Sequence, residues 1–399
     1  MHRGNRFIIL LCMLVPATLL MAGTEALRYE QQSLVMDGQR VQVSIPAGMQ
    51  LELVSADFDS PRLITFAENG DLFMGSRSGH IYRVPPPYTK PEIILSMSGY
   101  PHNVAFRDGE ILIAETGGLY RAPYQIGQKE VLEETVSLLA ALPGGSGHNS
   151  RTVRVGSDGK IYASLGIQGN CSDQYIDESY EFQERRGGVF VLDESGRKPE
   201  WKPYASGLRN PVGFDWHPQT GVMYASNNGP DHLGFELPPE YFARLDPGSF
   251  QGMPWFQFDG KTLKRDPCIK SKSPRPAEAV SLPVATFPAR NAPMGVRFVP
   301  TGALEKSLQH DAIVALKGSW GTQPSGGAFG DPASRRKPML AVVRFKKGKA
   351  LRVDPLVTGF QFESGHRWAR PVGVAFGPDG ALYFSSDSGI NGLFRLKKR

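Results

Sequence analysis

Residues 69–84, NGDLFMGSRSGHIYRV, contain the pattern that decides the fold: an Asn-Gly turn, a run of alternating apolar side chains, a second Gly turn and another such run. Alternation with a period of two between Gly turns is typical of a β-hairpin. The same phrase returns in residues 108–121, 157–192, 220–224, 311–345 and 379–396. Repeats of one supersecondary unit along a whole chain indicate a radial array. The sequence therefore predicts an all-β chain folded as a six-bladed β-propeller.

The N-terminal stretch differs in composition from the repeats. Arg3 precedes an apolar run over residues 7–21, and small residues follow that run up to Ala26. A basic start, a short apolar stretch and small residues are typical of a secretory signal peptide, and the run is too short to span a bilayer comfortably. We predict a signal peptide over 1–26 and a propeller over 27–399, with no transmembrane helix after cleavage. The protein is then periplasmic or secreted; an uncleaved N-terminal anchor is the alternative.

The segment between this leader and the first repeat also alternates. Val35, Val41 and Val43 are its apolar positions. We expect residues 27–43 to pair with the last blade and so to close the ring, which would leave no open sheet edge.

Lys and Arg residues are spread along the chain, whose formal net charge is +6. The sequence has no basic stripe interleaved with aromatic residues, and this argues against a nucleic-acid partner. A mildly basic propeller instead suits an anionic small molecule at its centre.

The chain has 3 cysteines, and Cys12 lies in the predicted leader. Cys171 and Cys268 stand alone in the sequence, which is not the spacing of a zinc site. In an oxidising compartment they would form a disulfide, and two unpaired thiols are the alternative that the sequence leaves open.

Four segments between strands are long and rich in Gly, Pro, Ser and Asn: residues 166–186, 229–252, 254–293 and 318–339. Loops of a propeller leave from strand ends, so several of them can gather over one mouth of the central channel. We therefore expect a ligand site at that mouth.

Two polar clusters precede strands. Residues 144–151, GGSGHNSR, hold His148 in a Gly-rich loop, and a neutral imidazole near physiological pH is a natural general base. A histidine that only satisfies backbone groups of a turn is the competing interpretation. Residues 207–213, GLRNPVG, contain Arg209 and Asn210, a guanidinium fork and an amide that fit a carboxylate or a developing oxyanion. An arginine that bridges two blades would explain the same position.

A third cluster follows the fourth repeat. It contains a Gly229-Pro230 kink, with Asp231 and Glu236 close behind. Ca²⁺ is bound by mixtures of carbonyl and carboxylate oxygens, although the spacing here is not that of an EF-hand loop. An Asx-type turn would account for these residues without a metal.

Cations and aromatic residues also border the later repeats. Lys317 follows a strand of the fifth blade and Arg370 opens the last blade, where either could pair with an anionic ligand; a solvated surface cation is the commoner use. Trp255, Trp320 and Trp368 are predicted to lie in loops, where they stack on a flat ligand or cap blade hydrophobics.

Taken together, these motifs resemble the pyrroloquinoline quinone (PQQ)-dependent sugar dehydrogenases of the soluble glucose dehydrogenase and L-sorbosone dehydrogenase type. The similarity covers most of the chain from about residue 53 onward. It is carried by GHNS at 147–150, GLRNPVG at 207–213, NGPDHLG at 228–234, KGSW at 317–320 and RPVGV at 370–374.

The resemblance implies an oxidoreductase that acts on a sugar or a related alcohol or aldehyde. His148 matches the family's general base, which takes the proton of the substrate hydroxyl while hydride passes to the quinone. Arg209 matches the residue that bonds the quinone oxygens, and Asn210 matches its neighbour at the cofactor. The electron acceptor is expected to be a quinone or a cytochrome.

The same resemblance implies how the cofactors are held. Lys317 and Arg370 match positions that hold the carboxylates of PQQ, which is a trianion. Gly229 and Pro230 match the backbone carbonyls that ligate Ca²⁺, a Lewis acid beside the quinone.

The sequence departs from the family pattern at two positions. The glucose dehydrogenases have an Asp just before the catalytic His, where this chain has Gly147, and one of the paired cofactor arginines is replaced by Trp368. These changes argue against glucose as the substrate more than they argue against the quinone as the cofactor. A metal-dependent lactonase using Asp231 and Glu236, or a non-catalytic sugar- or protein-binding propeller, are the alternative functions.

Overall fold

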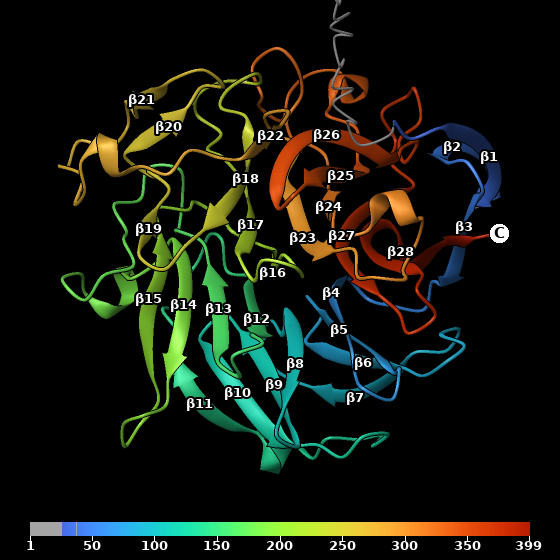
Figure 1. The fold of residues 1–399 in the computed structure, drawn as a ribbon, viewed down its shortest axis with the longest axis horizontal. Helices are drawn as coiled ribbons and strands as arrows, with labels where there is room; N and C mark the ends of the chain where they lie inside the picture. Colours follow the sequence, from blue (N-terminus) through green and yellow to red (C-terminus); the bar gives the residue numbers. More distant parts are fainter. Residues whose placement is uncertain (1–25, 37) are drawn as a thin grey trace, which may run out of the picture.

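The computed structural model describes residues 26–36 and 38–399, so residues 1–25 of the predicted leader lie outside the described residues. Six antiparallel sheets are arranged around a common axis (Figure 1). The described residues contain strands and short 3₁₀ helices and no α-helix, and none of their helices is long and apolar enough to cross a membrane. The prediction of a six-bladed β-propeller is confirmed.

Blades 1 to 3 follow one another along the chain, each running from its inner to its outer strand. Blade 1 is β4 (Pro61–Phe66), β5 (Leu72–Ser76), β6 (His80–Val84) and β7 (Glu92–Ser96). Blade 2 is β8 (Asn103–Arg107), β9 (Glu110–Glu115), β10 (Gly118–Pro123) and β11 (Ser137–Ala141). Blade 3 is β12 (Arg151–Val155), β13 (Ile161–Leu165), β14 (Gly188–Asp193) and β15 (Glu200–Ser206), with β19 (Ser249–Phe250) added in parallel to β15.

Blades 4 to 6 complete the ring. Blade 4 is β16 (Phe214–Trp216), β17 (Met223–Asn227), β18 (Glu240–Leu245) and β22 (Ala285–Phe287). Blade 5 is β23 (Pro293–Phe298), β24 (Ala312–Leu316), β25 (Met339–Lys346) and β26 (Lys349–Val357). Blade 6 is β27 (Ala369–Phe376), the long β28 (Leu382–Lys398) and β3 (Met49–Ser55).

The remaining elements decorate the propeller. Two small hairpins are β1 (Tyr29–Met36) with β2 (Gln39–Pro46), and β20 (Phe256–Phe258) with β21 (Leu263–Arg265). The 3₁₀ helices are η1 (Glu133–Thr135), η2 (Phe182–Glu184), η3 (Ala277–Ala279), η4 (Lys306–Leu308) and η5 (Pro332–Ser334).

The sequence repeats correspond to the second and third strands of the blades. β5, β13 and β24 are buried at every position, because each blade packs both of its faces against neighbouring blades. Apolar clusters between the sheets form the core, such as the one that joins Tyr224 and Phe242 of blade 4 to Val314 of blade 5.

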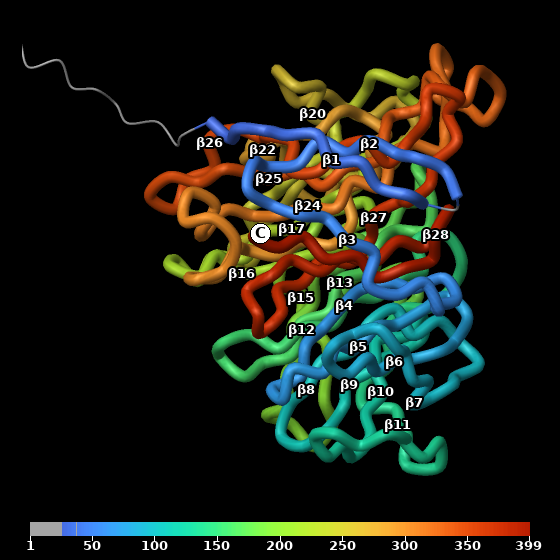
Figure 2. The backbone as a smooth tube through the Cα atoms, turned by 90° about the vertical axis from the view of Figure 1, so that its right-hand side faces the viewer, coloured from blue at the N-terminus to red at the C-terminus, as the bar shows by residue number. Residues whose placement is uncertain are grey.

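The ring is closed by β3, which pairs with the second half of β28 in blade 6. The prediction that residues 27–43 close the ring is therefore wrong. β1 and β2 pair with each other, and the hairpin touches the end of β26 through a bridge from Ser44 to Thr358 (Figure 2). Burial does not separate the two segments, because Val43 of β2 is as fully buried as Met49 and Leu51 of β3. The segments differ in their strand partners: β3 pairs with β28, whereas β2 pairs with β1.

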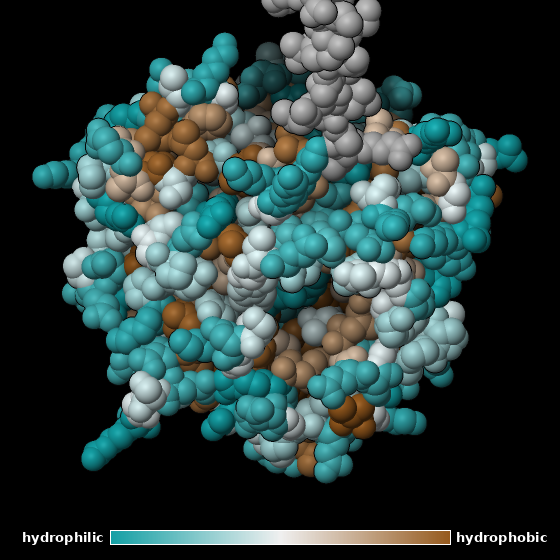
Figure 3. Space-filling view, in the orientation of Figure 1, coloured by the Kyte–Doolittle hydropathy of each residue, from teal (hydrophilic) through white to brown (hydrophobic). Residues whose placement is uncertain are grey.

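Antiparallel pairing sets which residues share an end of the propeller. Within each blade the inner strand begins where the second strand ends, as the partners Arg151 and Leu165 show. Loops at these points therefore gather on one face, which we call the mouth. The space-filling view shows one face of the molecule, hollowed near its centre (Figure 3).

Candidate active site

All of the predicted site residues lie at the mouth. His148 precedes β12, and Arg209 and Asn210 precede β16. Gly229 and Pro230 follow β17, Lys317 follows β24, and Arg370 is the second residue of β27. Five separate sequence segments thus supply one end of the propeller.

Gly166 is the point at which three of these residues meet. A Cβ built on Gly166 would lie 2.7 Å from Cβ of His148, 2.8 Å from the carbonyl oxygen of Arg209 and 2.9 Å from Oδ1 of Asn210. Side chains essentially never make such close contacts, so this approach of blades 3 and 4 requires a glycine. Sequence analysis did not single out this residue.

The His148 imidazole is fixed in one orientation. Its Nδ1 lies 2.5 Å from the carbonyl oxygen of Ile167. A carbonyl can only accept, so Nδ1 carries the proton and Nε2 keeps its lone pair. Burial, followed by the positive charge of Arg209, lowers the pKa of His148 to about 4. The ring is therefore neutral at physiological pH.

Two buried arginines that sequence analysis missed hold the His148 loop. Arg151 Nη1 and Arg186 Nη2 donate to the carbonyl oxygen of His148, at 2.9 and 3.0 Å. Arg186 also donates to the carbonyls of Gly144 and Ser146. The main chain of the polar Gly-rich loop is therefore held in place by hydrogen bonds from these two arginines.

Arg209 is buried and paired. Its Nη2 lies 3.0 Å from Asp231 Oδ2, and Nε and Nη2 donate to Asn170 Oδ1 at 3.0 and 2.7 Å. Burial lowers the pKa of Arg209. Asn210 continues the turn through its main chain, which donates to Asn227 Oδ1 at 2.9 Å.

The Gly229-Pro230 turn is buried beside a buried carboxylate. Gly229 N–H donates to Glu240 Oε2 at 2.5 Å, and burial raises the pKa of Glu240 to about 7. Within the part of the chain that the structure describes, neither carbonyl of the turn accepts a hydrogen bond. Two free carbonyl oxygens near a carboxylate form a donor set of the kind that Ca²⁺ takes.

The other two oxygen donors considered from sequence are engaged elsewhere. Asp231 pairs with Arg209 and also with Arg290. Glu236 is exposed and pairs with Arg336 at 2.5 Å. The geometry therefore does not bring these two carboxylates together on a metal.

The opposite side of the mouth is a cation cluster around Asp387. Asp387 Oδ2 lies 2.5 Å from Arg62 Nη1 and 2.6 Å from Lys317 Nζ. Arg370 donates to the carbonyls of Lys317 and Gly318, both at 3.0 Å. Two cations thus pair with one carboxylate and a third is held beside them, an excess of positive charge that fits a polyanionic ligand.

Titration properties follow from this crowding. Burial, followed by the Arg62 guanidinium, lowers the pKa of Lys317 to about 7 against the opposing pull of Asp387. Burial alone would raise the pKa of Asp387, but Arg62 and Lys317 lower it to about 2. Sequence analysis missed both Arg62 and Asp387. For Arg62 the available signal was a charged residue inside the otherwise apolar strand β4, whereas Asp387 lies in a polar stretch of β28 that gave no such signal.

A chain of contacts joins the cation cluster to His148. Arg62 Nη2 lies 3.3 Å from Nε2 of the buried His102, whose Nδ1 lies 3.0 Å from the carbonyl oxygen of Arg151. Arg151 in turn holds the main chain of His148. The two sides of the mouth are therefore parts of one polar network.

The structure decides between the two uses foreseen for the tryptophans. Trp255 and Trp368 are 0% and 2% exposed and pack in apolar clusters, so they cap blade hydrophobics. Trp320 is 54% exposed and follows the Lys317 turn, where a ligand can still reach it. Arg367, beside Trp368, is occupied by Gln361 and by the carbonyl oxygen of Arg336.

The structure contains the Cys171–Cys268 disulfide, one of the two alternatives left open by the sequence. A ring nitrogen of His232 and the two sulfur atoms all lie within 4.8 Å of one another. The disulfide joins the segment after β13 to the insertion between β21 and β22.

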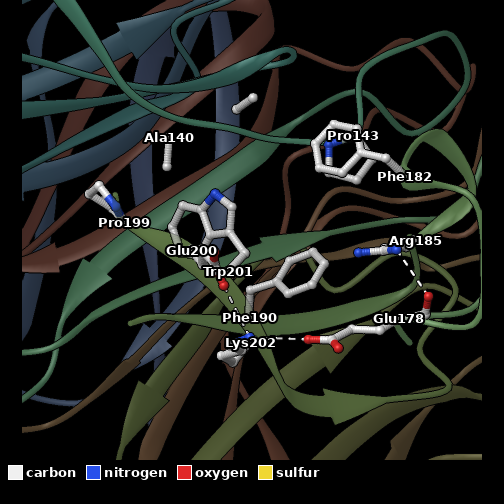
Figure 4. Close-up of a pocket in the computed structure, with 11 residues that line it drawn as sticks. Ala140, Pro143, Glu178, Phe182, Arg185, Phe190, Pro199, Glu200, Trp201 and Lys202 are labelled. Atoms are coloured by element: carbon white, nitrogen blue, oxygen red, sulfur yellow. Dashed lines mark hydrogen bonds and ion pairs between the residues drawn. The ribbon is translucent and has the colours of Figure 1, made fainter. Parts of the chain in front are cut away.

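A separate pocket of about 450 Å³ lies near the strands of blade 3 (Figure 4). Phe182, Phe190 and Trp201 contribute aromatic side chains to it, and Lys202 pairs with both Glu178 and Glu200 at its edge. It contains none of the predicted site residues, and its charged groups neutralise one another. The mouth, with its unbalanced charge, is the stronger candidate for a site.

Comparison with known proteins places the chain among sugar dehydrogenases. Residues 114–319, just over half of the chain, match the sequence model of the glucose/sorbosone dehydrogenase family. An uncharacterised protein of Borreliella burgdorferi is 24% identical over 372 residues, which cover 89% of this chain and 90% of that protein.

Solved structures share the fold at low identity. A calcium structure of a Trichoderma reesei carbohydrate-active enzyme of family AA12 aligns with a TM-score of 0.75 at 17% identity, over 95% of this chain and 100% of that chain. The holo form of the PQQ domain of pyranose dehydrogenase from Coprinopsis cinerea aligns with a TM-score of 0.68 at 18% identity, over 90% of this chain and 97% of that chain. With the family match, these likenesses lead to one conclusion: the chain belongs to the glucose/sorbosone dehydrogenase family.

Proposed function

We propose that this family member is a PQQ- and Ca²⁺-dependent dehydrogenase that oxidises a sugar or a related alcohol or aldehyde, in the periplasm or outside the cell. The observation that carries the proposal is the pairing of two features at one mouth. One is a neutral imidazole whose Nε2 has no hydrogen-bond partner among the described residues. The other is a cluster of three buried or half-buried cations, two of them paired with a single carboxylate.

The cation cluster would hold the carboxylates of PQQ. Lys317 and Arg370 are anchored by Asp387 and by main-chain carbonyls, so their positive ends need little reorganisation when an anion binds. Arg62 adds a third positive charge that the resemblance did not indicate. A trianion fits this excess of charge far better than a neutral sugar does.

The Gly229-Pro230 turn would ligate Ca²⁺ through its carbonyl oxygens, with Glu240 compensating part of the ion's charge. When bound, PQQ accepts the hydride that leaves the substrate carbon. Ca²⁺ beside it would act as a Lewis acid.

The chain's own residues would handle the proton and the developing charge. His148 Nε2 takes the proton of the substrate hydroxyl, because Nδ1 is already committed to Ile167. Arg209 is directed by Asn170 and Asp231 and would stabilise negative charge at the quinone oxygens. Buried and already oriented, it needs no rearrangement during the reaction.

The local structure explains why this chain has Gly147 where the glucose dehydrogenases have an Asp. Gly147 has a φ of +83°, and a Cβ there would lie 1.8 Å from the carbonyl oxygen of Gln168. An aspartate before His148 is therefore incompatible with this loop conformation. The substrate pocket lacks that carboxylate, which supports a substrate other than glucose.

A titration of the mature protein with PQQ and Ca²⁺ tests the proposal, followed by absorbance and by dye reduction over a panel of sugars, alcohols and aldehydes. We expect stoichiometric binding and dye reduction with at least one substrate. No binding at micromolar PQQ would overturn the proposal. Lactone hydrolysis without an electron acceptor would then favour the lactonase, and saccharide binding without dye reduction would favour a binding propeller.

A further inference from the structure

Arg209 is held by a residue that the motifs did not indicate. Asn170 Oδ1 accepts hydrogen bonds from Nε and Nη2 of Arg209, at 3.0 and 2.7 Å, and from the main-chain N–H of Asp231 at 3.1 Å. One amide oxygen therefore fixes an edge of the guanidinium and also the residue that forms an ion pair with it.

Asn170 is also the neighbour of a crosslinked cysteine. Cys171 is bonded to Cys268, 97 residues away in the sequence. The Cys268 main-chain N–H donates to Asp266 Oδ1 at 2.9 Å, and the same oxygen lies 3.0 Å from His232 Nε2.

Together with the pairs around Arg209, these contacts form a closed loop of connected residues that begins and ends at the candidate active site. His232 follows Asp231, and Asp231 pairs with Arg209 at 3.0 Å. Starting from Arg209, the closed loop runs through Asn170 and Cys171, across the disulfide, and back through Asp266 and His232 to Asp231. Both residues that orient Arg209 are thus adjacent in sequence to members of this crosslinked segment.

The crosslink is more accessible than the residue it supports. Cys171 is exposed and Cys268 is half-buried, whereas Arg209 is 6% exposed. The imidazole of His232 lies close to both sulfur atoms. Thiol–disulfide exchange requires that an attacking thiolate reach one of the two sulfur atoms. A reductant can therefore reach the sulfur atoms without entering the mouth.

We propose that Asn170 is a positioning residue for Arg209, and that Cys171–Cys268 is a reversible thiol–disulfide site that controls this positioning. A dithiol supplies two electrons and two protons, so the S–S bond breaks, two thiols form, and the reductant leaves as its own disulfide. Opening the bond removes a crosslink from a loop-rich region and lets the segment after β13 carry Asn170 away from Arg209. The consequence for catalysis rests on the proposed function; the consequence for Arg209 does not.

The test compares PQQ titrations of the oxidised and the dithiol-reduced protein, with Ca²⁺ and without thiophilic metals, because two thiols and an imidazole would bind one. Thiol titration must first show two newly accessible thiols. We expect reduction to weaken PQQ binding about tenfold, the effect of losing a hydrogen bond to a charged group, and reoxidation to restore it. Cys171→Ser/Cys268→Ser should match the reduced protein and should not respond to the dithiol.

Asn170 variants separate positioning from general stability. Asn170→Ala with an intact disulfide should have the PQQ affinity of the reduced wild type. Reducing this variant should then change its PQQ affinity by less than about twofold, because both changes break the same connection to Arg209. Asn170→Asp keeps an acceptor oxygen and should recover most of the affinity. The inference is overturned if the reduced wild type keeps its affinity, or if reduction weakens Asn170→Ala by a further tenfold.

A cofactor-independent measurement distinguishes failure of this inference from failure of the proposed function. The side-chain Nε–H NMR resonance of Arg209 can be identified by its absence in Arg209→Lys. It should shift on reduction and in Asn170→Ala, in protein that holds no PQQ. If the oxidised wild type binds no PQQ, the proposed function fails, and this resonance alone decides the inference: a resonance that does not move on reduction overturns it.

Discussion

The two sides of the mouth are built from different chemistry. The side formed by blades 1, 5 and 6, which we call the charged half, pairs Arg62 and Lys317 with Asp387 and holds Arg370 against the carbonyl oxygen of Lys317. The side formed by blades 3 and 4, the base half, presents a neutral imidazole, two free carbonyl oxygens and an arginine already paired with a carboxylate.

Under the proposed function, this difference separates two tasks, which are binding of the anionic cofactor and transfer of a proton. Unbalanced positive charge contributes to binding an anion, and it does so equally before and during the reaction. A free Nε2 on a fixed imidazole contributes only when a proton moves. Changes in the charged half should therefore act on cofactor affinity, and changes in the base half should act on turnover.

The sharpest test of this separation is His148→Ala. Loss of a general base should lower turnover by about 10³-fold, while PQQ affinity stays within about threefold of wild type. Dye reduction at saturating PQQ and an absorbance titration measure the two quantities on one sample. His366→Ala, which removes an exposed loop histidine, is the matched control and should leave both unchanged. Turnover within tenfold of wild type would remove His148 from the role of base.

The second test perturbs the base half without removing a functional group. Gly166→Ala places a methyl group against His148, Arg209 and Asn210, and so pushes all three apart. A displacement of about 1 Å at a reacting group costs on the order of 10²-fold in rate. Gly117→Ala is the control, because a Cβ at Gly117 meets nothing within 4 Å. Equal activities of the two variants would mean that the close approach at Gly166 does not position the site.

The fold could be predicted from sequence because its information is local and repeated. The second and third strands of each blade carry the same pattern of turn and alternating strand. The repeat can therefore be recognised even where one copy departs from the pattern. The closing strand was assigned wrongly because β2 and β3 both contain alternating apolar residues, and both bury them in one core cluster. Only the pairing of β3 with the distant β28 distinguishes them, and that pairing is not local information.

The candidate site was predictable in part. Residues in motifs, such as His148 and Arg209, were identified because their neighbours in sequence form a recognisable loop. Asp387 was missed because its partners are remote: Arg62 is 325 residues away and meets it only when the first and last blades come together. Gly166 was missed for a similar reason. The sequence does not distinguish a glycine against which a neighbouring blade packs closely from any other loop glycine.

The third test moves to the charged half. Lys317→Met removes a half-buried cation that would bond a PQQ carboxylate, which should weaken binding by about tenfold to a hundredfold. At saturating PQQ the turnover should stay within about twofold of wild type, the reverse of the pattern for His148→Ala. Lys317→Arg keeps the charge and should recover part of the affinity. A loss of turnover at saturating PQQ would show that the two halves are not separable.

The smallest effect, and the most specific, is the opposite pH dependence of the two halves. Lys317 has a pKa of about 7 before an anion binds, and its protonated form favours the anion, so PQQ affinity should fall as pH rises above 7. The slope is at most about tenfold per pH unit for one proton, and it should vanish in Lys317→Met and Lys317→Arg. His148 has a pKa of about 4 and acts in its neutral form, so turnover at saturating PQQ should be constant from pH 8 down to about 5 and decline only below that. Affinity measured by absorbance and turnover measured by dye reduction, each from pH 4 to 9, check both directions. A turnover that already falls between pH 7 and 6 would mean that a charged, exposed imidazole, and not the buried one held by Ile167, is the base.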